Sequence, residues 1–223
     1  MPDLDLAFLS KITASMTHEL KNALAIIQES AGLMSDILSL AQKTPFPHQE
    51  KFHKVISTID QQVRRGVEIS TRLNRFAHSM DHPLATIELN HLLDQTAFLL
   101  RRFAQRKKLE LTVQASPQEI MVDTDPFRLQ MILADGIEHL AELLEPGARL
   151  ILTARPAGLD INIFVAVHGD KTSEWPGMIT QGAILEKLSH LRPVLEHLRG
   201  RLEPVETPEY AGLKVILPVS VER

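Results

Sequence analysis

Two long stretches of helical periodicity constrain this chain more than any other feature. Residues 6–42 contain no proline, and their apolar side chains recur at steps of three and four, which is typical of a helix with one buried face. A helix of about 36 residues would be about 54 Å long. Globular domains seldom use helices of that length, so we predict that this helix packs along a second long helix.

The second stretch supplies that partner. Residues 52–80 repeat the same spacing, and prolines at positions 45, 47 and 83 separate the two stretches and end the second one, because proline lacks a backbone donor. Since the connection is short, we predict an antiparallel helical hairpin over residues 1–82. Its apolar stripes are too long for one partner helix to cover, so we expect a homodimer with a four-helix bundle.

The sequence predicts both strands and helices in the remaining residues, 83–223. Alternating apolar residues predict strands at 86–89, 109–113, 149–155, 160–167, 201–205 and 213–219, and helical spacing predicts helices at 91–106, 127–144 and about 179–198. We expect Asn90 to cap the first of these helices. The predicted fold class is therefore α+β, with an α/β sandwich after the hairpin, in which helices cover one face of a sheet.

Composition excludes several classes of function. The chain has no cysteine, which excludes disulfides, zinc–thiolate sites, iron–sulfur clusters and a thiol nucleophile. A net charge of −4 argues against a nucleic-acid partner. No apolar run approaches the roughly 18 residues of a membrane span, and the first five residues lack the basic region of a signal peptide. We therefore expect a cytoplasmic protein without a membrane partner.

Three residues near the start of the chain form the candidate site. His18 lies between the apolar-stripe residues Met16 and Leu20, and Asn22 follows one helical turn later. An exposed imidazole can act as a nucleophile near neutral pH, and the adjacent Glu19 can hold or deprotonate its far ring nitrogen. An amide such as that of Asn22 can donate a hydrogen bond to a phosphoryl oxygen or position a water. For an isolated histidine, a solvated helix face is the commoner explanation.

The run His-Glu-Leu-Lys-Asn-Ala-Leu at residues 18–24 resembles the H-box of bacterial two-component histidine kinases, His-Glu-Leu-Lys/Arg-Asn/Thr-Pro-Leu, with Ala23 in place of the proline. The hairpin is similar to the dimerisation and phosphoacceptor domain of that family. The resemblance implies that His18 is the phosphoacceptor, that Glu19 is its acid–base partner, and that Asn22 is linked to phosphatase activity. Residues 88–93, 125–130 and 198–218 resemble parts of the ATP-binding domain.

The nucleotide-binding motifs depart from that family. The two positions that match its magnesium-binding asparagines carry Asp135 and His139, and the segments that match its glycine boxes, residues 168–173 and 185–188, lack the required glycines. Such glycines let backbone N–H groups approach phosphates. We therefore expect a degenerate domain that binds neither ATP nor a metal. Any Mg²⁺ would come with a partner receiver domain.

The resulting prediction is a homodimeric histidine phosphotransferase, or phosphatase, that acts through His18 on response-regulator receiver domains and does not phosphorylate itself. Two alternatives remain open. One is an ATP-dependent histidine kinase with a divergent nucleotide site, and the other is a non-enzymatic dimeric scaffold or inhibitor of a signalling partner. Because His18 lies so near the start of the sequence, we expect the input signal to come from another protein.

Overall fold

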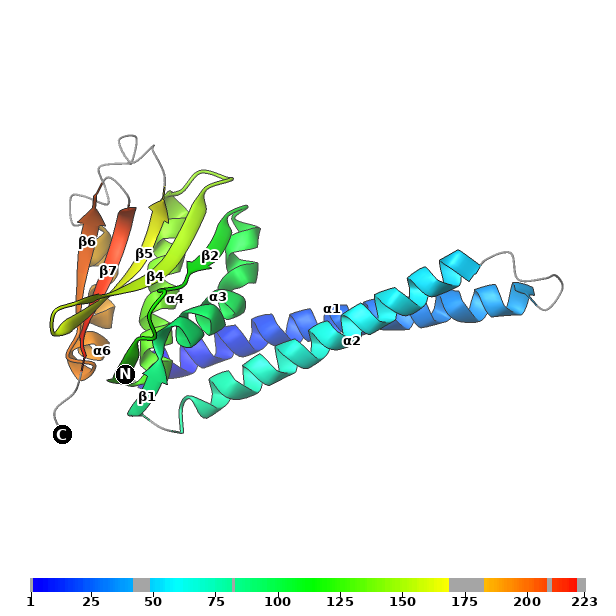
Figure 1. Cartoon of the computed structure of the whole chain (residues 1–223), viewed down its shortest axis with the longest axis horizontal. Coiled ribbons are helices and arrows are strands. Elements are labelled where there is room, and N and C mark those ends of the chain that lie inside the picture. Colours follow the sequence, from blue (N-terminus) through cyan, green and yellow to red (C-terminus); the bar gives the residue numbers. More distant parts are fainter. Residues whose placement is uncertain (1, 42–48, 82, 169–182, 208–209, 220–223) are drawn as a thin grey trace. The chain divides into compact units, whose positions relative to one another are not determined.

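The computed structural model describes residues 2–41, 49–81, 83–168, 183–207 and 210–219 (Figure 1). The chain divides into two compact units. One is the helical unit, Ser10–Ala77, and the other is the mixed unit, which combines Met1–Leu9 with His78–Arg223. A helical hairpin followed by a mixed sheet with helices confirms the predicted α+β class. No helix within the described residues is long and apolar enough to span a membrane.

The helical unit contains helix α1 (Pro2–Ala41) from Ser10 onward and helix α2 (Gln49–His78) up to Ala77, which lie antiparallel to each other (Figure 1). Both start and stop within a few residues of the predicted positions. Fully or nearly fully buried apolar side chains line the seam between the two helices: Ile12, Met16, Ala23 and Ile37 on α1, and Val55, Ile69 and Phe76 on α2. These residues follow the three- and four-residue steps of the sequence, so burial of one apolar face explains both helices.

The first turns of α1 belong to the mixed unit. Phe8 packs against Phe127, with ring centroids 5.4 Å apart, and the carboxylate of Asp5 lies 3.3 Å from the guanidinium of Arg128. Aromatic pairs at this separation are favourable beyond the area that they bury. The first turns of α1 are therefore part of the core of the mixed unit.

The mixed unit is built on a five-stranded sheet. Its strands are β2 (Glu110–Gln114), β4 (Arg149–Ala157), β5 (Asp160–His168), β7 (Tyr210–Pro218) and β6 (Arg201–Glu206), in that order. Only the pair β2–β4 is parallel among the pairs of this sheet. Helices α3 (Leu89–Arg106) and α4 (Pro126–Leu143) pack on the sheet (Figure 1). This arrangement matches the predicted sandwich.

Sheet register places the apolar core under α4. Leu152 pairs with Val165, which pairs in turn with Leu213. All three are at most 1% exposed, and Gly136 of α4 faces both Val165 and Leu213. Because side chains alternate across a strand, these residues mark the face of the sheet that the helices cover.

A small second sheet contains a strand that the sequence did not predict. Strand β1 (Ala85–Glu88) pairs antiparallel with β3 (Met121–Thr124). Because β3 has only four residues, its alternation of apolar and polar side chains is too short to distinguish a strand from a loop. Its pairing with β1 fixes the entrance to α3.

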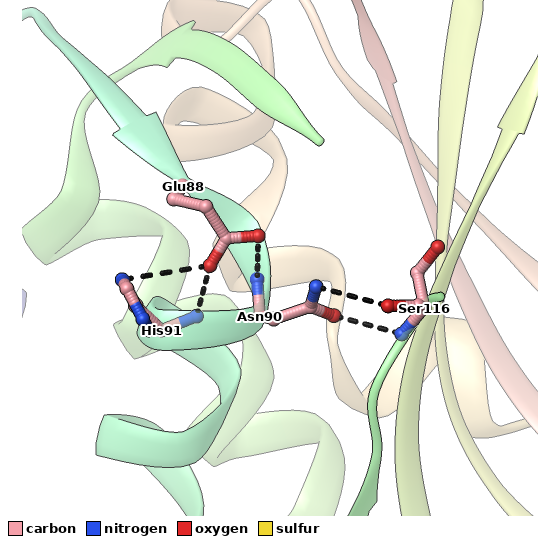
Figure 2. Close-up of polar contacts among 4 residues, drawn as sticks. All are labelled: Glu88, Asn90, His91 and Ser116. Carbon is pink, nitrogen blue, oxygen red and sulfur yellow. Dashed lines mark hydrogen bonds and ion pairs between the residues drawn. The ribbon is translucent and has the colours of Figure 1, made fainter. Parts of the chain in front are cut away.

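The predicted N-cap of α3 is wrong by two residues. Glu88 caps the helix, and its carboxylate accepts hydrogen bonds from the backbone N–H groups of Asn90, at 3.1 Å, and His91, at 2.7 Å (Figure 2). The amide of Asn90 instead donates to the carbonyl of Ser116 and accepts from its N–H, so it ties the loop before β3 to the helix. Asn90 therefore lies inside the first turn, and the strand ends one residue earlier than predicted.

The single helix predicted for residues 179–198 is also wrong. Residues 179–182 lie outside the described part of the chain, and the rest forms three short helical segments, α5 (Ala183–Lys187), η2 (Ser189–Leu191) and α6 (Arg192–His197). Pro193 stands in the first turn of α6. Since proline has no N–H and clashes with the preceding turn, a continuous helix cannot pass through it.

Candidate functional site

The predicted site lies on the outer side of α1 in the helical unit. Met16 and Ala23 are buried in the seam between the helices, whereas His18 and Asn22 are exposed. His18 and Asn22 are four residues apart on one helix, and such residues share a face. Both residues are therefore exposed on one face of α1.

Glu19 has a different environment from its neighbours. Its side chain is 16% exposed, and its carboxylate lies 3.3 Å from the guanidinium of Arg65 on α2, to which it is both hydrogen-bonded and ion-paired. Sequence analysis did not single out Arg65. The two residues are 46 positions apart, so only the register of the hairpin could have predicted that they meet.

The mixed unit carries a buried carboxyl group at the start of α4. Asp125 caps this helix by accepting a hydrogen bond from the N–H of Arg128 at 3.0 Å. Burial raises the pKa of the Asp125 carboxyl group above its usual value, although the N–H and the charge of Arg128, together with the charge of His197, act in the opposite direction. The imidazole of His197 lies 3.9 Å from the carboxylate. These contacts join the start of α4 to the end of α6.

The two residues at the expected magnesium-binding positions are engaged within the protein. The carboxylate of Asp135 lies 2.7 Å from Nε2 of His190 on η2. Nδ1 of the same imidazole lies 3.0 Å from the carbonyl of Lys187. His139, one turn after Asp135 on α4, places its Nδ1 2.9 Å from the Asp135 carbonyl. Both of these side chains therefore have intramolecular partners on or beside α4.

The remaining motif positions are only partly described. Residues 169–182, which include most of the expected first glycine box, lie outside the described part of the chain. The expected second box falls on α5 and the residue after it, where Lys187 lies 4.0 Å from Glu142 of α4. Within the described ranges, no group of three or more histidine or acidic side chains is arranged to bind a metal ion.

The chain shows low similarity to known proteins. No protein-family model matches it, and no curated protein matches it either. Among solved structures, it is similar to a histidine kinase from Burkholderia phymatum STM815, with 18% identity and a TM-score of 0.49 over 90% of this chain and 99% of that one. It is also similar to the Acinetobacter baumannii histidine kinase AdeS, with 11% identity and a TM-score of 0.48 over 91% and 98% of the two chains.

A third similar structure is titled as the histidine kinase ThkA in complex with the response regulator protein TrrA. Its identity is 13% and its TM-score 0.44, over 96% of this chain and 62% of that one.

Proposed function

We propose that this protein acts in two-component signalling as a histidine phosphotransferase, or phosphatase, of response-regulator receiver domains. The observation that carries the proposal is the exposed imidazole of His18, in a motif that resembles the H-box, with Asn22 exposed one turn away and Glu19 ion-paired to Arg65. All three residues lie on α1, and their exposure or pairing is what supports the proposal.

The proposed reaction is an in-line displacement at phosphorus. The lone pair of one imidazole nitrogen of His18 attacks the aspartyl phosphate of a receiver domain, and a P–N bond forms. The P–O bond breaks, and its electrons leave with the aspartate carboxylate. The other ring nitrogen carries the proton, whose positive charge the carboxylate of Glu19 helps to offset. The reverse reaction returns the phosphoryl group from His18 to the aspartate of a receiver. In the phosphatase reaction, a water beside Asn22 would attack the aspartyl phosphate of the receiver, and phosphate and the free aspartate would be released.

We include in the proposal that the chain works without ATP and without a metal of its own. The imidazole of His139 in place of an amide is a poor fit to Mg²⁺, which prefers oxygen ligands in octahedral geometry, and the Asp135 carboxylate is already hydrogen-bonded to His190. No glycine occurs at residues 185–188, so side chains would obstruct a close approach of phosphates to the backbone. Any Mg²⁺ needed would be bound by the receiver domain.

The proposed active form is a homodimer built on the helical unit. In one copy, large apolar side chains on both helices are 43–62% exposed: Leu24, Leu33 and Leu38 on α1, and Ile56, Val63 and Val67 on α2. Contiguous exposed apolar surface marks a site that binds another protein, and the spacing of Ile56, Val63 and Val67 puts these three side chains on one face of α2. We expect light scattering to give the mass of a dimer, and Leu24→Glu combined with Val67→Glu to give a monomer.

Transfer of radiolabel tests the function. The full chain is incubated with each receiver domain of the same genome, after the receivers are labelled with phosphate. We expect wild-type protein to acquire an acid-labile label and His18→Ala to acquire none. The control is His53→Ala, which removes another exposed histidine of the same unit and should label like wild type. Equal labelling of His18→Ala and wild type would refute the proposal.

Two other outcomes would favour the alternatives. If the wild type labels itself from ATP and Mg²⁺ alone, the chain is a histidine kinase with a divergent nucleotide site. If the chain binds a receiver or sensor protein but no receiver labels it, and His18→Ala binds equally well, the dimer is a scaffold or an inhibitor.

A further inference from the structure

We propose that Arg65 is a positioning residue of the His18 site, which acts by holding the carboxylate of Glu19; this inference rests on the proposed function. Arg65 Nη2 and Glu19 Oε2 are 3.3 Å apart. The Glu19 side chain is 16% exposed and that of Arg65 is 53% exposed, so the carboxylate is the more buried member of the pair.

Close packing of the two helices fixes this contact. A Cβ atom added to Gly66 would lie 3.5 Å from Cδ1 of Leu20, which is an ordinary van der Waals contact. Residues 66 and 20 therefore lie directly opposite each other, and residues 65 and 19 lie beside them. The register of the hairpin, rather than a chance rotamer, brings the guanidinium to the carboxylate.

Two buried polar atoms of the seam lie one turn away from the ion pair. Ser15, one turn before Glu19 on α1, has a buried hydroxyl oxygen, and Gln62, one turn before Arg65 on α2, has a buried amide oxygen. Neither atom has a hydrogen-bond partner among the described residues. Glu19 is itself largely buried, whereas Arg65 is half exposed, so solvent screens part of their attraction. The pair gives Glu19 a contact with the other helix that an isolated surface carboxylate would lack.

The adjacent Arg64 lacks this arrangement. Its side chain is 80% exposed, and its guanidinium lies 2.9 Å from Asp60 one turn earlier on the same helix. Pairs of that kind contribute little. Arg65 differs because it reaches the other helix, next to the residue that carries the nucleophile. Without Arg65, the Glu19 carboxylate, to which the proposed function assigns the offset of the charge on the His18 ring, would no longer be held in one position.

A double-mutant cycle on the full chain tests the inference. The initial rate of label transfer from a phosphorylated receiver is measured for wild type, Arg65→Met, Glu19→Gln and the double variant. We expect Arg65→Met to lower the rate roughly five- to tenfold, as coupled neighbouring residues do, and Arg65→Lys to restore part of it. In the Glu19→Gln background, Arg65→Met should have no further effect. Arg64→Met is the matched control and should transfer like wild type.

A receiver-independent arm separates this inference from the proposed function. In NMR spectra of the full chain, Arg65→Met should shift the ring signals of His18, whereas Arg64→Met, or Arg65→Met added to Glu19→Gln, should not. Wild-type rates in Arg65→Met, or additive losses of rate in the double variant, would overturn the positioning role. A shift of the His18 signals without labelling of the wild type by any receiver would overturn the proposed function and leave the coupling intact.

Discussion

Glu88 offers the sharpest test of how the mixed unit is stabilised. Its carboxylate accepts two backbone hydrogen bonds at the start of α3. Losing an N-cap costs about 0.5–2 kcal/mol, and a hydrogen bond to a charged group contributes about 1.5–3 kcal/mol. We therefore expect Glu88→Ala to lower the free energy of unfolding by about 2 kcal/mol. The expected loss for Glu88→Gln, which keeps an acceptor oxygen but not the charge, is about 1 kcal/mol.

The pH dependence of that effect has a defined sign. Burial acts to raise the pKa of Glu88, but backbone hydrogen bonds from His91 and Asn90, with the charge of His91, outweigh it, so the pKa in the folded protein is lower than 4.5. A lowered carboxyl pKa stabilises the fold above the unfolded value and ceases to do so as the pH falls through the folded value. The difference between wild type and Glu88→Gln should be complete at pH 7 and shrink below pH 4.5.

Thermal unfolding followed by circular dichroism measures these effects. For a chain of this size, about 1 kcal/mol shifts the melting temperature by roughly 2–4 °C. At pH 7 we expect losses of about 4–8 °C for Glu88→Ala and about 2–4 °C for Glu88→Gln. Equal melting of wild type and Glu88→Gln at pH 7, or a gap that widens on acidification, would refute this account of the cap.

Three further substitutions test the sheet and the core. In Gly212→Ala, the new Cβ would overlap the carbonyl oxygen of Val165 and lie 2.7 Å from Cα of Ala166, so we expect β7 to separate from β5 and the yield of soluble protein to collapse. Gly158 has φ +67° and open space around it; Gly158→Ala should cost only about 1 kcal/mol in urea unfolding and leave label transfer unchanged. Leu133 is fully buried, and Leu133→Ala should lower the urea midpoint by the equivalent of about 2–5 kcal/mol. An unaffected midpoint would show that the core under α4 is not closely packed.

Periodicity predicted the long elements because burial of one face dictates it over many turns. Both helices of the hairpin, and α3 and α4, begin and end within a few residues of their expected positions. The errors occur where a few residues decide the outcome. Strand β3 has only four residues, which are too few to show an alternation of apolar and polar side chains. The N-cap of α3 depends on where strand β1 ends, and it ends at Glu88 rather than beside Asn90.

In the candidate site too, local features could be predicted from the sequence and long-range contacts could not. Exposure of His18 follows from its place between two stripe residues, which is local information. The partners of Glu19 and Asp135 are not local, since Arg65 is 46 positions from the first and His190 is 55 positions from the second. Such pairings depend on helix register and on how short segments pack, and neither leaves a signal in residue spacing.

The position of β7 affects how the protein matures during synthesis. This strand lies between β5 and β6, although both precede it in the chain. A nascent chain that has emerged from the ribosome only as far as β6 therefore has an incomplete sheet, with an unpaired edge on β5 that can join other chains. The two helices of the hairpin emerge earlier and can pair with each other, and only the first turns of α1 await α4, against which Asp5 and Phe8 pack. We expect chaperones to act mainly in the interval before Pro218 emerges.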